Sequence, residues 1–298
     1  MTAGERLVDF EERGLALGGG TGPRLRYLAA GAGPPILLVH GLGGSSLNWT
    51  AVAPALAARH RLIVPDLPGH GGSEPIPALS SLEPLADALA SLVEREQAAP
   101  VPVVGHSLGG LVALRLAVRR PELVAGILLC AAAGISSSLT YARYVLEVLA
   151  VLRPGRRLAA HRARIGASAR LRRATFSWWG AADPAVLPTE VVDGFLAGWE
   201  RHTDTRSAAR AMVADDIRSD LPRVTQPRIV LWGARDNQVG MADAFEYARR
   251  LEAPLRTIPD CGHLLIGERP DAVLLAVREL LDRVRQLDEL PLEAEPIG

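Results

Sequence analysis

The stretch Val103-Val104-Gly105-His106-Ser107-Leu108-Gly109-Gly110 contains a Gly-x-Ser-x-Gly motif, and it decides how the rest of the chain is interpreted. A valine-rich run at 101–104 precedes the motif, and a helical pattern follows it directly. This order predicts a strand, a sharp turn and a helix, with Ser107 in a strained backbone conformation and its hydroxyl above the sheet edge. Gly105 and Gly109 flank Ser107 because a Cβ at either position would collide with the neighbouring strand or helix.

The composition is that of a globular protein with one large α/β domain, or one such domain with an insertion. The chain has 298 residues, 48% hydrophobic and 22% charged, which is enough to bury a sizeable core. The formal net charge is zero, so we expect no nucleic-acid partner. Cys130 and Cys261 lack metal-ligand spacing and indicate a reducing compartment. Because neither a signal-peptide pattern nor a transmembrane segment is recognised, we expect a cytoplasmic protein. The sequence leaves open whether the chain forms a homodimer.

Strand patterns and helical patterns alternate along most of the chain, which predicts a largely parallel sheet with helices on both faces. The glycine turn at 18–20 joins the first two strands. The expected strands lie near residues 7–9, 25–28, 36–40, 62–64, 101–104, 127–130, 229–232 and 255–258. The expected helices lie near residues 48–59, 82–97, 111–120, 242–251 and 271–286.

The alternation stops near Gly134 and resumes only after residue 215. Between them we find helical patterns, at 141–152 and 191–199, and no buried-strand run. We therefore interpret residues 134–215 as a helical cap inserted into a core of residues 1–133 and 216–298. Within that core, the proline- and acid-containing tail at 287–298 is expected to fray.

A serine nucleophile requires a base, an acid that orients the base, and donors for an oxyanion. Catalytic groups of such sheets lie at the carboxyl ends of the strands. His263 follows the strand at 255–258, and Asp236 follows the strand at 229–232. The loop after 127–130 is Ala131-Ala132-Ala133-Gly134 and offers no carboxylate, so Asp236 is the expected acid.

For the oxyanion we expect two backbone donors, the N–H groups of Leu42 and Leu108. Leu108 follows the nucleophile, and Leu42 lies in the loop after the strand at 36–40. This chemistry requires neither a metal nor an organic cofactor. We assign His106 to packing and hydrogen bonding beside the turn, and assign structural roles to three polar residues of the neighbouring loops, which are His40, Asp66 and His70.

Five motifs together resemble the α/β-hydrolase superfamily: His40-Gly41-Leu42-Gly43, Asp66-Leu67-Pro68-Gly69-His70-Gly71, Gly105-His106-Ser107-Leu108-Gly109, Gly233-Ala234-Arg235-Asp236 and Gly262-His263. The resemblance implies the α/β-hydrolase fold: a mostly parallel sheet of about eight strands, a Ser-Asp-His triad and a helical cap. The branch it resembles contains capped esterases and meta-cleavage-product C–C hydrolases. Because the nucleophile position is serine rather than aspartate, the similarity to haloalkane dehalogenases and epoxide hydrolases ends at the fold.

These observations predict a serine hydrolase that cleaves a small-molecule carboxylic ester, or a similar acyl compound, through an acyl-enzyme. Three alternatives stay open. The same triad could hydrolyse a C–C bond of a vinylogous diketone, or transfer the acyl group to an alcohol or amine. The chain could also be a sensor that binds a small ligand under the cap and retains only vestigial hydrolysis.

The expected cap contains a run of arginines with no acidic residue between them. One interpretation is a solvated helix face. The other is an electropositive surface that steers an anionic substrate or contacts phospholipid. The run comprises Arg153, Arg156, Arg157, Arg162, Arg164, Arg170, Arg172 and Arg173.

Overall fold

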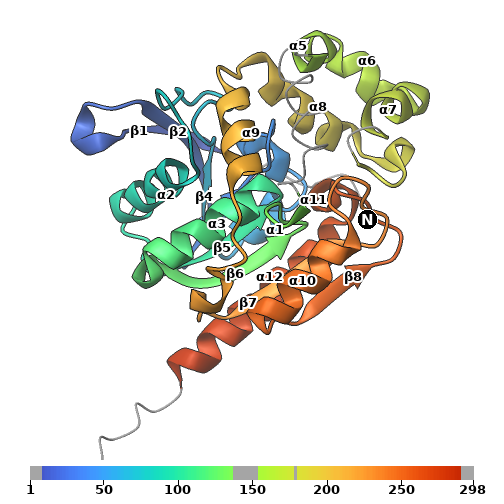
Figure 1. The fold of residues 1–298 in the computed structure, drawn as a ribbon. Helices are drawn as coiled ribbons and strands as arrows, with labels where there is room; N and C mark the ends of the chain where they lie inside the picture. Colours follow the sequence, from blue (N-terminus) through green and yellow to red (C-terminus); the bar gives the residue numbers. More distant parts are fainter. Residues whose placement is uncertain (1–8, 137–153, 178–179, 290–298) are drawn as a thin grey trace, which may run out of the picture.

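The computed structural model describes residues 9–136, 154–177 and 180–289 of the protein (Figure 1). Eight strands form one sheet in the order β1-β2-β4-β3-β5-β6-β7-β8. Strand β2 pairs antiparallel with both β1 and β4, and all other pairs are parallel, which confirms the predicted sheet. The strands are β1 Glu11–Ala16, β2 Arg24–Ala30, β3 Pro35–Val39, β4 Arg61–Pro65, β5 Val101–His106, β6 Val124–Cys130, β7 Arg228–Gly233 and β8 Leu255–Ile258.

The described helices cover the sheet and fill the segment between β6 and β7. The longer helices are α1 Ala53–Ala57, α2 Glu83–Arg95, α3 Leu108–Arg119, α5 Pro154–Ala159, α6 Arg162–Ala167, α7 Ala169–Phe176, α8 Thr189–Ala197, α9 Thr205–Ala214, α10 Met241–Leu251, α11 Leu265–Glu268 and α12 Pro270–Asp288. Short 3₁₀ turns are η1 Gly18–Gly20, η2 Ser46–Trp49, η3 Pro121–Leu123, η5 Pro184–Val186, η6 Gly198–Glu200 and η7 Leu221–Arg223. No helix in the described part of the chain is long and apolar enough to cross a membrane.

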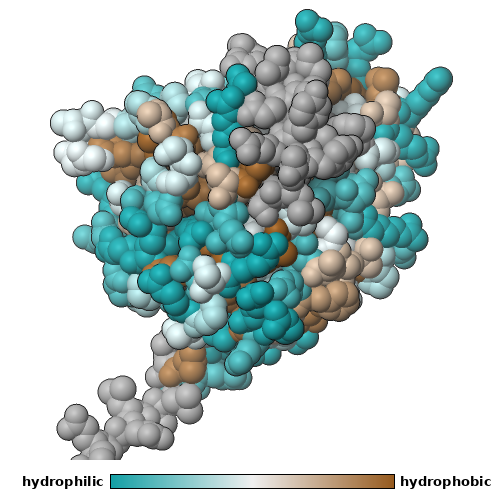
Figure 2. Space-filling model, viewed as in Figure 1, coloured by the Kyte–Doolittle hydropathy of each residue, from teal (hydrophilic) through white to brown (hydrophobic). Residues whose placement is uncertain are grey.

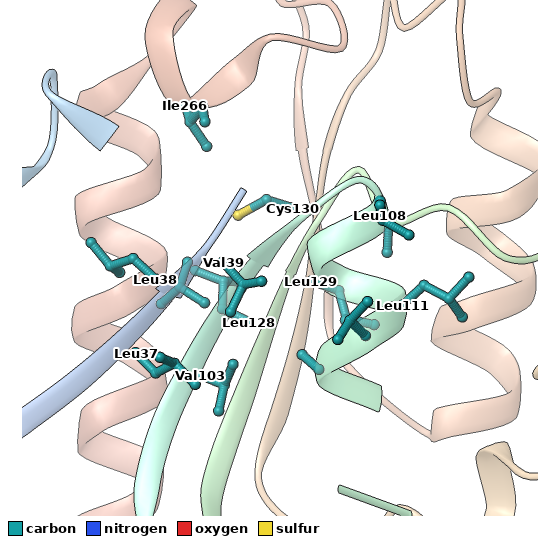
Figure 3. Close-up of a cluster of buried hydrophobic side chains, with 14 of the residues drawn as sticks. Leu37, Leu38, Val39, Val103, Leu108, Leu111, Leu128, Leu129, Cys130 and Ile266 are labelled. Carbon is teal, nitrogen blue, oxygen red and sulfur yellow. The ribbon is translucent and has the colours of Figure 1, made fainter. Parts of the chain in front are cut away.

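The core is built around the central strands β3, β5 and β6. Apart from Pro35 and Ala125, their residues are buried, as expected for parallel strands covered on both faces. Leu37 pairs with Val103 and Leu38 with Val104, so the three strands end at one edge of the sheet. Helices α3 and α12 lie on opposite sides of these strands (Figure 3). This packing holds the turn after β5 in place from both faces.

Three elements differ from their predicted bounds. The expected helix at 48–59 is divided into η2 and α1, because Pro54 lacks an N–H and suits the first turn of a new helix. The first described strand, β1, begins later in the chain than the strand expected at 7–9, and residues 7–8 lie outside the described part. The η1 turn sets the register of β1 against β2, in which Ala16 pairs with Arg24. Helix α12 continues to Asp288, so the start of the expected tail is helical.

Between β6 and β7 the described residues form helices and turns. Helices α5 to α8 lie together at one end of the molecule, beyond the helices that flank the sheet (Figure 1). This arrangement agrees with the helical character expected for 134–215, while the division into two domains stays a prediction. The expected helix at 141–152 and the tryptophan pair Trp178-Trp179 lie outside the described residues.

Candidate active site

Ser107 lies in the turn between β5 and α3 with a φ of 52° and a ψ of −118°. This left-handed φ is strained for a residue with a Cβ, and backbone hydrogen bonds of Ser107 maintain it. The Ser107 N–H donates to Cys130 O at 3.0 Å, and Ser107 O accepts from Gly110 N and Ala133 N at 3.0 and 3.1 Å. A Cβ on Gly109 would overlap the backbone carbonyls of β3, so the predicted reason for this glycine is confirmed.

His263 and Asp236 form a buried pair at the ends of the last two strands. His263 Nδ1 lies 2.8 Å from Asp236 Oδ2, and the Asp236 side chain has no solvent exposure. Asp236 Oδ1 accepts from the N–H groups of Gln238 at 2.8 Å and Val239 at 2.9 Å. Because Asp236 accepts, Nδ1 carries the imidazole proton, and Nε2 remains available as a base. The structure therefore brings the predicted base and acid together.

His106 connects the serine turn to the histidine loop. Its Nε2–H donates to His263 O at 2.8 Å, and the two imidazole rings lie 4.9 Å apart. Burial lowers the pKa of His106 to about 3, so the ring is neutral at physiological pH. Ser107 follows directly in the chain, so this contact places the elbow beside the His263 loop. His106 therefore has the packing and hydrogen-bonding role expected from the sequence, and its hydrogen-bond partner is the backbone carbonyl of His263.

The sequence did not suggest two other residues that support the His263 loop. The His263 N–H donates to Gly180 O at 2.6 Å, from the segment between α7 and α8. Glu268 accepts from Ala182 N at 2.7 Å and from Gly262 N at 3.2 Å. Burial raises the pKa of Glu268, although these N–H groups oppose the shift. Glu268 thereby holds the loop and the inserted segment against each other.

The Leu42 loop lies against the serine turn. A Cβ on Gly41 would be 3.0 Å from both Ser107 Cβ and the His106 ring. His40 Nε2 accepts from Leu67 N at 2.9 Å, so its Nδ1–H donates to Gly41 O at 2.7 Å. Gly41 O and the Leu42 N–H belong to one planar peptide and point in opposite directions. His40 therefore orients the predicted oxyanion donor, a role more specific than the structural one expected from sequence.

Asp66 braces the loop that carries Leu67. It pairs with Arg26 at 2.6 Å and accepts from Ser46 N at 2.7 Å and Gly72 N at 2.8 Å. Burial alone would raise the pKa of Asp66, but its charged and N–H neighbours hold the pKa below the usual range. The expected structural role of Asp66 therefore has a concrete basis in these contacts.

Within the part of the chain that the structure describes, the arginine run is partly neutralised. Arg162 pairs with Asp193 and Glu200, both at 2.9 Å, and Arg172 donates to backbone carbonyls. Arg173 lies 3.7 Å from Asp183. Arg157, Arg164 and Arg170 are exposed and have no described acidic partner, and the surface at the α5–α7 end shows hydrophilic patches beside hydrophobic ones (Figure 2). Arg153 and the side chain of Arg156 lie outside the described residues.

A mostly parallel sheet with a serine elbow, and a His–Asp pair at neighbouring strand ends, defines the class of α/β folds with a nucleophile elbow. The profile of the alpha/beta hydrolase family matches residues 36–277. The chain belongs to the α/β-hydrolase family.

Three known proteins illustrate the range of its relatives. The dihydrolipoyllysine-residue acetyltransferase component of the acetoin cleaving system of Pseudomonas putida is 30% identical over 263 residues, covering 85% of this chain and 65% of that protein. Lipase LipV of Mycobacterium tuberculosis is 31% identical over 256 residues, covering 83% and 92%. The structure of a thermophilic esterase from Thermogutta terrifontis superposes with a TM-score of 0.72 at 27% identity, covering 92% and 99%. The chain spans between 34% and 65% of the length of several curated relatives.

Proposed function

We propose that the protein is a serine hydrolase that cleaves a small-molecule carboxylic ester with Ser107, His263 and Asp236. The observation that carries this proposal is the buried His263–Asp236 pair at 2.8 Å, on the loop that His106 ties to the Ser107 turn. Such a pair leaves Nε2 as the proton acceptor on the side away from the carboxylate. Lipase and esterase relatives support the same reaction class.

In the first half of the reaction Ser107 Oγ attacks the ester carbonyl carbon while His263 Nε2 takes the hydroxyl proton. Asp236 keeps the imidazole in the required tautomer and stabilises the imidazolium. The N–H groups of Leu42 and Leu108 donate to the oxyanion; neither donates a hydrogen bond within the described residues, so both are available. Each such donor contributes about 3–4 kcal/mol to the transition state.

Collapse of the tetrahedral intermediate breaks the bond to the alcohol, which leaves with the proton from His263 Nε2. The acyl group remains as an ester on Ser107. Water then attacks this ester, His263 Nε2 takes the water proton, and a second collapse releases the carboxylic acid and returns the proton to Ser107 Oγ. No group outside the chain is consumed except ester and water.

Residues 134–215 are proposed to act as the cap of this site. Two contacts support this role: Gly180 O accepts from the His263 N–H, and His202 lies 2.9 Å from Gly43 O in the Leu42 loop. The inserted segment thus contacts the base loop and the predicted oxyanion loop. A cap so placed would decide which acyl and alcohol groups enter.

The test is a panel of p-nitrophenyl esters of graded chain length, assayed with the wild type and with the variants Ser107→Ala and His263→Ala. We expect turnover by the wild type and loss of nearly all turnover in both variants. A fluorophosphonate probe should label the wild type and leave Ser107→Ala unlabelled. Unchanged hydrolysis by either variant would overturn the assignment.

The same panel separates the open alternatives. Faster turnover of a dienone diketone than of any ester would favour C–C hydrolysis. Product partition toward an added alcohol at millimolar concentration would favour acyl transfer. A single turnover, followed by a slow ligand-triggered change in the cap, would favour a sensor.

A further inference from the structure

His202 follows η6 and reaches from the inserted segment to two loops of the core. The Gly71 N–H donates to His202 Nδ1 at 2.9 Å, and His202 Nε2 lies 2.9 Å from Gly43 O. Because Nδ1 accepts a hydrogen bond, the imidazole proton lies on Nε2, which therefore donates to Gly43 O. Both ring nitrogens are thus used, and only the neutral ring with this tautomer can make both bonds.

The residues after His202 reinforce this contact. The N–H groups of Thr203 and Asp204 both donate to Gly69 O at 3.0 Å. A Cβ on Gly69 would collide with the Asp204 backbone, so the two segments approach each other closely. The segment 202–204 is therefore fastened to the loop 66–73, and the His202 ring extends this attachment to Gly43.

On the side where a Cβ would point, no described atom packs against Gly43, so a hydrogen bond to its carbonyl contributes more to holding it. Its φ is +68°, and a Cβ built on it would meet no atom within 4 Å. On the preceding side, Gly41 O is held by His40 and by the Gly44 N–H at 3.0 Å. The Leu42 N–H thus lies between one carbonyl held from the core and one held from the inserted segment.

We propose that His202 is a positioning residue that fixes the oxyanion loop from the cap side, so that the Leu42 N–H is aligned only while the cap segment is docked. This inference rests on the proposed function, since it assigns His202 to the oxyanion hole of that reaction. It follows from the two bonds of His202 and from the open space that the described residues leave on the Cβ side of Gly43. His202 touches no reacting atom, so its effect reaches the reaction through Gly43 and Leu42.

Three substitutions separate the two bonds of His202. His202→Gln retains a side-chain N–H for Gly43 O, His202→Asn retains an oxygen for the Gly71 N–H, and His202→Phe retains ring volume without either bond. The matched control is His161→Gln, an exposed histidine of the same inserted segment. For each variant we would measure kcat and KM on a p-nitrophenyl ester, and the melting temperature.

Loss of an oxyanion donor lowers kcat by about 10²–10³, and misalignment removes part of that contribution. We therefore expect His202→Phe and His202→Asn to lower kcat by about 10- to 100-fold. His202→Gln and His161→Gln should stay within about threefold of the wild type, and KM should change little in all four variants. A kcat for His202→Phe within twofold of the wild type, or a His202→Gln as slow as His202→Phe, would overturn the proposal.

Hydrogen exchange provides a readout that does not depend on ester hydrolysis. The Gly44 and Gly71 N–H groups report on the two loops, and both should exchange faster in His202→Phe than in the wild type or His161→Gln. Unchanged exchange would overturn the positioning role even if kcat fell. If the wild type hydrolyses no ester and its Ser107 resists the fluorophosphonate, the proposed function fails, and the exchange rates still decide whether His202 holds the loops.

Discussion

Replacing Asp236 with asparagine changes one atom and reverses the direction of one hydrogen bond. Oδ1 of Asp236 accepts from the N–H groups of Gln238 and Val239, so the amide oxygen of asparagine must occupy that position. The amide NH₂ then faces His263 Nδ1 at the 2.8 Å position. The opposite orientation would leave two N–H donors facing an NH₂ group, at a cost of about 1–3 kcal/mol for each unpaired donor.

A donor facing Nδ1 forces the imidazole proton of His263 onto Nε2, where it blocks proton transfer from Ser107. A substitution of this kind lowers kcat by about 10⁴ in a serine triad, which is about 5.5 kcal/mol of transition-state stabilisation. The assay is p-nitrophenyl ester hydrolysis at pH 7–8, with ¹⁵N chemical shifts of the imidazole as a direct measure of the tautomer.

The matched control is Asp260→Asn, since Asp260 is exposed and pairs with Arg235 at the surface. That variant should keep wild-type turnover. A loss smaller than tenfold in Asp236→Asn, an equal loss in Asp260→Asn, or an imidazole still protonated on Nδ1 would refute the tautomer argument.

Three further predictions concern the backbone strain at Ser107, the histidines whose pKa values are lowered, and the arginine run. Ser107→Gly should raise the free energy of unfolding by about 1 kcal/mol, because glycine tolerates a φ of 52°, while it abolishes hydrolysis. Urea denaturation should show this gain for Ser107→Gly and no such gain for Ser107→Ala. Equal unfolding free energies for the two variants would contradict the backbone strain at Ser107. Three buried histidines and the partly buried His202 have pKa values below the usual 6.5. Their neutral forms therefore stabilise the fold above pH 6.5, and this stability is lost as pH falls toward 4, at about 1.4 kcal/mol per pH unit for each additional proton bound on unfolding. Unfolding free energies measured between pH 7 and 4.5 should show this slope, and a flat profile would contradict it. These histidines are His40, His70, His106 and His202. If the exposed arginines steer an anionic substrate, kcat/KM for a carboxylate-bearing ester should fall steeply with added salt and Arg164→Glu should reduce that fall, whereas a flat salt dependence would favour a merely solvated face.

Much of the fold could be predicted because local patterns specify it. The valine-rich run before Ser107 and the helical pattern after it match β5 and α3. The strand-end rule selected His263 and Asp236, and the structure places the two in contact. Their catalytic roles, with Ser107 and the two oxyanion donors, stay predictions until the variants are assayed.

The supporting contacts could not be predicted, because they join residues far apart in the chain. Glu268 and Ala182 are 86 residues apart, and His202 and Gly43 are 159 residues apart. In the sequence, Glu268 stands between the His263 loop and the expected helix at 271–286, and its residue type alone does not mark it as a support of that loop. Only the folded chain shows that its carboxylate accepts from the N–H groups of the histidine loop and the inserted segment.

The sequence by itself determined the order of strands and helices, the elbow around Ser107 and the loops that carry His263 and Asp236. These features depend on side-chain periodicity and on residue types that only certain turns accept. The tertiary structure decided which arginines are neutralised and which imidazoles hold the loop around Leu42. The physical reason is that an ion pair or hydrogen bond depends on the meeting of two distant groups in space, and residue type in one segment carries no record of its partner in another.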